Sequence, residues 1–346
     1  MRMEKNRTIW LDLQNPSDVL FFKPVVSELQ EFKFHTTIRD RAETVSLSRQ
    51  YGIEGAVIGS HHTDRLRKYV GAMTRFAKLT IASKDFDVGF SFEGGLAVAV
   101  AKTKRRPSVL FCDNDLKLFH KKIYLQDMEN WTKLRAEKIV IPSACFESFS
   151  AHTDAGRLLT FDGYKEDIYI ADFKPDTSFM KNLPFNRFVV VRPEALDSGY
   201  VSAKKSLVPA LLQMLRKENL NVIYLPREAY DFRPHHDPGI FVPPSALNGL
   251  DLCYSSDAVI TGSGTLAREG ACMGKTAVSF FPGERLLSVD KQLADEGRML
   301  HSRDPTEIVS YVLSRKGGVA RPDFAKSKKV KDQMLTGLRG VLSAFS

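Results

Sequence analysis

Residues 257–274 read DAVITGSGTLAREGACMG, and this stretch decides which fold the sequence indicates. Residues 257–260 predict a short buried strand, residues 261–265 a tight turn with two glycines, and residues 266–273 a helix that ends at Gly274. A strand, a turn and a helix in this order point backbone N–H groups at an anion, and glycines permit a ligand to approach closely. The stretch therefore predicts an α/β domain with an anion site at the turn.

The turn supplies candidate residues for binding a phosphorylated ligand. These residues are Gly262, Ser263, Gly264 and Thr265. Either Ser263 or Thr265 can cap the helix, and Glu269 lies about one turn further on, where its carboxylate can reach a sugar hydroxyl group. The alternatives are a purely structural turn and a salt bridge from Glu269 to Arg268 or Lys275. The spacing matches neither a P-loop nor the G-x-G-x-x-G fingerprint.

The same alternation of strands and helices extends along the chain. Short apolar segments typical of buried strands lie at 8–13, 34–39, 53–58, 87–91, 108–112, 187–191, 222–225 and 276–280. Strands that alternate with helices predict parallel sheets, and a chain of 346 residues exceeds one ordinary core. We therefore expect an α/β protein with two domains, 1–178 and 179–323, with a linker near 172–184, where Asp, Pro, Thr and Asn cluster.

Charged residues follow several predicted strands. Ligands of open α/β sheets bind at the carboxyl ends of strands, which makes Asp12, Glu93 and Asp113 candidate catalytic bases. Asp12 can alternatively be a turn or cap residue. In the second half, Arg192 and Arg227 follow strands and can either bind a diphosphate or form surface ion pairs.

The composition narrows the classes of partner. The net charge of +9 favours an acidic partner, which can be a nucleotide diphosphate, an anionic lipid or a nucleic acid. No recognised nucleic-acid module is present, and no His or Cys spacing fits a metal site, so we expect no nucleic acid, metal or cofactor. The first residues contain no apolar segment typical of a signal peptide, and the apolar run at 95–101 is too short for a bilayer, so a cytoplasmic protein is expected.

Residues 66–83 predict a basic amphipathic helix. Its apolar side would carry Leu66, Tyr69, Val70, Met73, Phe76 and Leu79. Its basic side would carry Arg65, Arg67, Lys68, Arg75 and Lys78. Two interpretations stay open: the apolar side packs in the core while the basic side faces solvent, or the helix rests on an anionic membrane surface at the inner face of the membrane.

A series of ordered motifs resembles the DUF354 family, which has the GT-B architecture. The motifs are WLDLQNP at 10–16, FFKP at 21–24, TIRD at 37–40, FCDN at 111–114, YKE at 164–166, FKPD at 173–176, VRPE at 191–194, GSGTLARE at 262–269 and FPG at 281–283. The resemblance implies two Rossmann-like domains with parallel sheets facing an interdomain cleft. It also implies a nucleotide-diphosphate sugar held mainly by the second domain, and a last helix within 324–346 that crosses back to the first domain.

More distantly, the chain is similar to UDP-N-acetylglucosamine 2-epimerases and MurG-like glycosyltransferases. This similarity implies a metal-independent glycosyltransferase that moves a sugar to an unknown, lipid-linked or membrane-near acceptor. The epimerases carry a histidine where this chain has Val191, which disfavours epimerisation. A 2-epimerase and a non-catalytic nucleotide-sugar-binding protein remain the alternatives.

Overall fold

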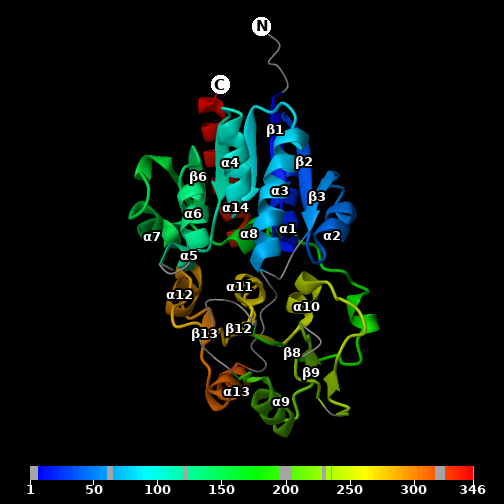
Figure 1. Ribbon diagram of the computed structural model, residues 1–346. Coiled ribbons are helices and arrows are strands. Elements are labelled where there is room, and N and C mark those ends of the chain that lie inside the picture. The colour runs from blue at the N-terminus through cyan, green and yellow to red at the C-terminus, as the bar shows by residue number, and fades with distance from the viewer. Residues whose placement is uncertain are drawn as a thin grey trace. The chain divides into compact units, whose positions relative to one another are not determined.

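The computed structural model describes residues 7–60, 65–119, 124–194, 205–227, 231–234, 236–315 and 324–345, without the side chains of 65–69 and 124–126. The chain divides into two compact units, one of Met1–Tyr169 with Val330–Ser346 and one of Ile170–Lys329. Each unit contains its own sheet with alternating helices (Figure 1). The expected α/β class is therefore confirmed.

The first unit is built on a parallel sheet. Its strands are β1 (Thr8–Leu13), β2 (Lys33–Asp40), β3 (Ala56–Ser60), β4 (Val88–Phe92), β5 (Ser108–Phe111), β6 (Lys138–Pro142) and β7 (Leu158–Phe161). Among the described residues, these seven strands have the order β3-β2-β1-β4-β5-β6-β7, and neighbouring strands pair in parallel. The helices are α1 (Pro16–Glu28), α2 (Thr44–Gln50), α3 (Arg65–Ala82), α4 (Gly95–Thr103), α5 (Leu116–Phe119), α6 (Tyr124–Lys133), α7 (Phe146–Ser150), α8 (Lys165–Ile170) and α14 (Ala325–Ala344).

Successive side chains of a strand point to opposite faces of the sheet, so their contacts show which helices cover each face. Trp10 of β1 lies in an apolar cluster with residues of α3 and α4, and its ring contacts Phe86. On the other face, Phe21 and Phe22 of α1 pack edge-on against Phe111 of β5. Since α6 packs beside α4, the helices α3, α4 and α6 form one layer on the sheet (Figure 1).

The orientation of α3 corrects part of the amphipathic assignment. Leu79 is buried and Phe76 packs against the core as expected, whereas the side chains at 65–69 lie outside the described residues. Val70 and Met73, expected on the core side, are 62% and 57% exposed. Arg75, expected on the solvent side, is buried, because its guanidinium group donates to Asp12 Oδ1 (2.7 Å) and to the Ile58 carbonyl oxygen (3.0 Å). A buried carboxylate needs a cationic partner, and this requirement sets which side of α3 faces the sheet.

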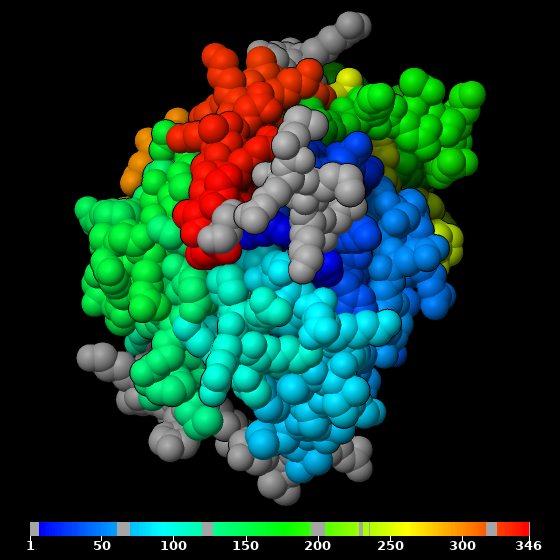
Figure 2. Space-filling model, turned by 90° about the horizontal axis from the view of Figure 1, so that it is seen from above, coloured from blue at the N-terminus to red at the C-terminus, as the bar shows by residue number. Residues whose placement is uncertain are grey.

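The last helix, α14, packs on the first unit along most of its length. A Cβ atom on Gly337 would lie 2.8 Å from Leu159 Cδ1, so the absence of a side chain lets the helix approach β7. Lys331 Nζ lies 3.0 Å from Glu28 Oε1, and Arg339 donates to the Glu28 carbonyl oxygen (2.7 Å). Figure 2 shows this helix, in red, beside the green residues of the same unit. It therefore lies on the α1 side of the sheet.

The second unit is also built on a parallel sheet. Its strands are β8 (Val189–Arg192), β9 (Val222–Tyr224), β10 (Ile240–Phe241), β11 (Ala258–Thr261), β12 (Thr276–Ser279) and β13 (Met299–His301). In the described part of this unit, the six strands have the order β10-β9-β8-β11-β12-β13. The helices are α9 (Val208–Lys217), α10 (Gly249–Ser255), α11 (Gly264–Cys272), α12 (Ser288–Asp295) and α13 (Pro305–Ser314).

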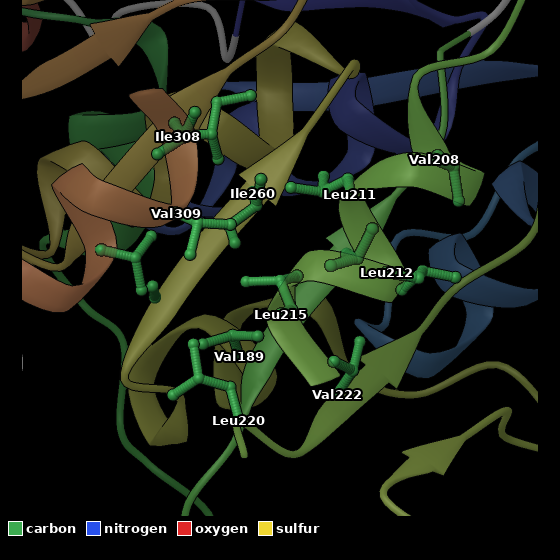
Figure 3. Close-up of a cluster of buried hydrophobic side chains, with 14 of the residues drawn as sticks. Val189, Val208, Leu211, Leu212, Leu215, Leu220, Val222, Ile260, Ile308 and Val309 are labelled. Carbon is green, nitrogen blue, oxygen red and sulfur yellow. The ribbon is translucent and has the colours of Figure 1, made fainter. Parts of the chain in front are cut away.

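The core of the second unit lies between its sheet and the helices α9 and α13. Figure 3 shows the side chains of this cluster, which include Val189, Leu211, Leu215, Ile260, Ile308 and Val309. On the opposite face, α11 lies close to β11, since a Cβ atom on Gly270 would be 3.1 Å from Val259 Cβ. The sheet is thus covered on both faces, as parallel sheets are.

None of the described helices combines the length and the apolar character that a bilayer span requires.

Candidate functional site

The glycine-containing turn connects β11 to α11 at the carboxyl edge of the second sheet. The N–H of Gly262 donates to the Arg192 carbonyl oxygen (3.0 Å), and the N–H of Ser263 donates to Thr261 Oγ1 (2.8 Å). A Cβ atom on Gly262 would lie 2.6 Å from the Cα atom of Glu194, so glycine is required by the close approach of the two backbones. The turn is therefore held firmly against the end of β8.

The first turn of α11 is the candidate anion site. Ser263 occupies the N-cap position, but within the described part of the chain its side chain forms no capping hydrogen bond. Thr265 lies inside the first turn of the helix and not at its cap. First-turn N–H groups that no side chain caps are the groups that bind phosphate oxygens at the start of helices. The predicted turn and helix are present, whereas the predicted side-chain cap is not formed.

A buried ion pair lies beneath this first turn. Arg268 Nη1 and Asp290 Oδ1 are 2.8 Å apart, and both side chains are 3% exposed. A Cβ atom on Gly264 would lie 2.9 Å from Arg268 Nη1, so this glycine leaves room for the guanidinium group. The pair joins α11 to α12 and fixes the direction in which the helix start points.

Glu269 is buried on the side of α11 that faces α10. Its Oε2 atom lies 3.9 Å from the position that a Cβ atom on Gly249 would take. Burial, together with the nearby Glu269 carboxylate, raises the pKa of the Cys253 thiol well above its usual value. The role of Glu269 toward a sugar hydroxyl stays a prediction.

The two candidate arginines follow different strands of the second sheet, and only one of these strands is next to β11. Arg192 ends β8, the direct neighbour of β11, and its carbonyl oxygen contacts Gly262. Arg227 follows β9, one strand further out, where its side chain is exposed and its N–H donates to Asp231 Oδ2 (2.6 Å). The fold therefore brings Arg192, but not Arg227, directly to the turn.

A second ionic cluster at the same sheet edge was missed in the sequence. Glu194 is buried, and its carboxylate accepts from the Leu207 N–H (3.0 Å) and from Ser206 Oγ (2.8 Å). Arg303 Nη1 lies 3.4 Å from Glu194 Oε1 and donates to the Phe280 carbonyl oxygen (2.7 Å). The motif VRPE ends on Glu194, but Arg303 lies 109 residues further along the chain. No local sequence pattern could therefore predict this ion pair.

In the first unit, Asp12 has a structural environment. It is 0% exposed, and besides Arg75 it accepts from Thr37 Oγ1 (2.7 Å) and Gln14 Nε2 (3.1 Å). A carboxylate with no exposed atom cannot contact an acceptor. Asp12 is therefore better explained as the partner of Arg75 than as a catalytic base.

Asp113 belongs to a buried group of charges at the carboxyl edge of the first sheet. Its Oδ2 atom lies 2.9 Å from Lys165 Nζ of α8. Asp18, in the first turn of α1, accepts from the N–H groups of Gln14 (2.9 Å) and Asn15 (3.0 Å). Burial raises the pKa of Asp18 to about 7, although these hydrogen bonds and Lys165 act in the opposite direction. Sequence reasoning missed Asp18 and Lys165, although the motif YKE contains the lysine.

Glu93 follows β4 in a strained backbone conformation, with φ of 54°. Its Oε2 atom lies 2.7 Å from Lys133 Nζ and 3.5 Å from Lys117 Nζ, and its Oε1 atom accepts from the Asn114 N–H (3.2 Å). Burial would raise the pKa of Glu93, but the two lysines outweigh it and lower the pKa to about 2. A carboxylate with so low a pKa is a weak general base near neutral pH.

The lowered pKa of Glu93 predicts an acid-dependent loss of stability. A depressed carboxyl pKa stabilises the fold above the unfolded pKa of 4.5, and this contribution is lost as the pH falls toward about 2. Glu93→Gln should therefore lower the free energy of unfolding by up to ~3 kcal/mol at pH 6 and by much less at pH 3. Urea unfolding at both pH values measures this. Glu129→Gln removes a more exposed partner of Lys133 and is the control; an equal, pH-independent loss in both variants would contradict the prediction.

Within the described ranges, no three His, Cys, Asp or Glu side chains come together as a metal site.

Comparisons with known proteins agree with this architecture. The family described as "Protein of unknown function (DUF354)" matches residues 7–325. An uncharacterized protein of Methanocaldococcus jannaschii is 27% identical over 325 residues, which cover 90% of this chain and 92% of that protein.

Solved structures of similar fold include two enzyme classes. A UDP-N-acetylglucosamine 2-epimerase from Rickettsia bellii has a TM-score of 0.74 at 12% identity, covering 99% of this chain and 97% of its own. The 2-epimerase from Neisseria meningitidis, bound to UDP-GlcNAc, has a TM-score of 0.65 at 12% identity, with 95% and 99% covered. The glycotransferase of kitacinnamycin has a TM-score of 0.65 at 11% identity, with 99% of both chains covered. The GT-B type of fold is therefore confirmed.

Proposed function

This chain belongs to the DUF354 family, and from that premise we propose that it is a GT-B glycosyltransferase that binds a nucleotide-diphosphate sugar at residues 262–265. The observation that carries the proposal is the turn before α11, where Gly262 is locked against Glu194 and the Ser263 side chain, among the described residues, provides no cap. The start of a helix can stabilise an anion by up to about 2 kcal/mol. A diphosphate is an anion of this kind, and the Neisseria meningitidis structure of similar fold is bound to UDP-GlcNAc.

Arginine side chains at the same sheet edge support a diphosphate as the ligand. Arg192 ends the strand next to the turn, and Arg303, whose side chain is 32% exposed, is anchored by Glu194 and Phe280. Anchored guanidinium groups can bind diphosphate oxygens and stabilise the charge that develops on the leaving group. Glu269 would then bind a hydroxyl group of the donor, and Arg227 has the weaker case because it lies one strand further out.

Asp113 is a stronger candidate than Asp12 for the base that activates an acceptor hydroxyl, because its side chain is 6% exposed whereas that of Asp12 is 0% exposed. Asp113 lies at the carboxyl edge of its sheet, and its pairing with Lys165 fixes the carboxylate in one position. Glu93 is held as an ionised carboxylate by two lysines and suits acceptor positioning better than proton transfer.

The test of the donor site is thermal unfolding of the full chain with UDP, GDP and dTDP. A nucleotide at about 100 times its Kd should stabilise the fold by about 2.7 kcal/mol, which raises the Tm by several degrees. Uridine without phosphate should give no shift, because the turn binds the diphosphate. If no nucleoside diphosphate raises the Tm, the proposed donor site is wrong.

A second candidate function is 2-epimerisation, because two of the similar structures are UDP-N-acetylglucosamine 2-epimerases. Incubation with UDP-N-acetylglucosamine alone separates the two functions. A 2-epimer formed without an acceptor supports the epimerase, and sugar transfer that needs an acceptor supports the transferase. Binding without either product supports a non-catalytic sensor.

A further inference from the structure

Large apolar side chains are exposed on the helical layer of the first unit. On α3, Val70, Met73 and Ile81 are 62%, 57% and 80% exposed. On α6, Met128 and Trp131 are 51% and 61% exposed. Both helices pack against α4, so the two stripes belong to one face of the unit, and α3 and α4 also lie side by side in Figure 2 (light blue and cyan). We call these five residues the apolar face.

The apolar face is more than ordinary scatter of surface residues. Of the large apolar side chains that are exposed in the described part of the chain, Phe232 alone belongs to the second unit. Single exposed apolar residues are common, but their concentration on neighbouring helices marks an interaction surface. The side of α3 that sequence periodicity assigns to the core is in part this surface, because Arg75 occupies the buried side.

Positive charge accompanies the apolar face. Residues 65–84 contain six Lys and Arg residues and no Asp or Glu, although one of the six, Arg75, is buried against Asp12 and the exposed Asp85 follows this segment directly. Lys78 is exposed on α3, and Lys104 Nζ donates to the carbonyl oxygen of the exposed Lys84 (2.6 Å), just beyond Ile81. Just beyond the end of α6, the Arg135 guanidinium group stacks on the ring of Trp131, 3.3 Å from its centroid. The exposed Asp127 and Glu129, whose side chain is 42% exposed, lie on α6, so the basic excess is along α3.

We propose that the apolar face rests on the surface of an anionic lipid bilayer. A basic helix with exposed Val, Met and Ile, and a Trp stacked with Arg, has the chemistry of an interfacial surface, in which apolar groups enter the headgroup boundary while cations contact lipid phosphates. A neutral apolar partner would explain the exposed side chains but not the basic excess. The inference stands on the first unit alone and does not depend on the donor site.

Co-sedimentation of the full chain with lipid vesicles tests the proposal. The protein should bind vesicles that contain phosphatidylglycerol at least about tenfold more tightly than vesicles of phosphatidylcholine alone, and added salt should weaken the binding. The double variant Met73→Glu/Ile81→Glu should lose at least about tenfold in affinity. Phe232→Glu, the same type of change at an exposed residue of the second unit, is the matched control and should bind like the wild type.

Tryptophan fluorescence gives an independent readout. The chain has two tryptophans, of which Trp10 is 0% exposed and Trp131 is 61% exposed, so a blue shift on adding vesicles reports Trp131. Trp131→Phe should abolish the shift while most of the sedimentation remains. Absent vesicle binding, equal binding by the double variant and the control, or binding without a Trp131 shift would each overturn the proposal. An oligomer that the double variant dissociates, without vesicle binding, would assign the face to a second copy. The UDP-induced Tm shift should be unchanged in every variant.

Discussion

Replacing Arg75 by methionine is expected to lower the free energy of unfolding of the first unit by about 3–5 kcal/mol. The guanidinium group of Arg75 is 3% exposed and pairs with the fully buried Asp12 at 2.7 Å. Methionine fills a similar volume but leaves the Asp12 carboxylate buried without its counter-charge. The loss should be large because the same carboxylate also orders Thr37, whose hydroxyl group accepts from Trp10 Nε1 (3.0 Å).

Urea unfolding followed by tryptophan fluorescence measures this effect, since Trp10 and Trp131 both belong to the first unit. Lys78→Met, at an exposed position on the same helix, should change stability by less than about 0.5 kcal/mol. Adding Asp12→Asn to Arg75→Met should restore a large part of the loss, because asparagine removes the unpaired charge. If Arg75→Met costs no more than Lys78→Met, the ion pair does not have the structural role that we assign to it.

Local patterns identified the elements of this fold because they depend on neighbouring residues. The strand at 8–13 follows from its apolar run, and the end of α11 follows from Gly274, whose φ of 69° suits glycine at a helix end. The turn at Gly262 was identifiable for the same reason. Its close contact with Glu194 was not, because that contact joins segments that are distant in the sequence.

The orientation of α3 shows where local patterns fail. Periodicity alone places Val70 and Met73 in the core, whereas the ion pair to Asp12 rotates the helix so that Arg75 and Leu79 face the sheet. The free energy of leaving a buried carboxylate unpaired, about 3–5 kcal/mol, exceeds the roughly 1.5–3 kcal/mol gained by burying one apolar side chain. The partner of Asp12 lies 63 residues away, so no window along the sequence contains both groups.

Local patterns likewise predicted one part of the candidate site and missed another. Its backbone part, the turn and the start of α11, was predictable, because glycine and a following helix form a local pattern. Its ionic part was not, because Lys165 pairs with Asp113, and Arg303 with Glu194, only after distant strands have come together. Likewise, two lysines lower the pKa of Glu93, so that this candidate base is a stable carboxylate in the structure.

The largest effect on the proposed donor site is expected from Gly262→Val. A Cβ atom at this position would lie 2.6 Å from the Cα atom and 2.7 Å from the backbone nitrogen of Glu194, and backbone atoms cannot rotate away as a side chain can. The turn must therefore move, and with it the first N–H groups of α11 that would bind the diphosphate. We expect the affinity for UDP to fall at least about 100-fold, since a displaced turn loses several charge-assisted hydrogen bonds at once.

Gly274→Ala is the matched control for this change. Gly274 has a positive φ of 69°, nothing lies within 4 Å of its would-be Cβ atom, and it follows the far end of α11. Alanine there should cost about 1 kcal/mol through backbone strain alone and leave the Kd for UDP unchanged. Both variants should unfold at a lower Tm, but only Gly262→Val should lose the shift that UDP produces. Because both variants are less stable, loss of the UDP-induced Tm shift in Gly262→Val alone would locate the diphosphate at the turn. An unchanged Kd for UDP in Gly262→Val would place the nucleotide elsewhere.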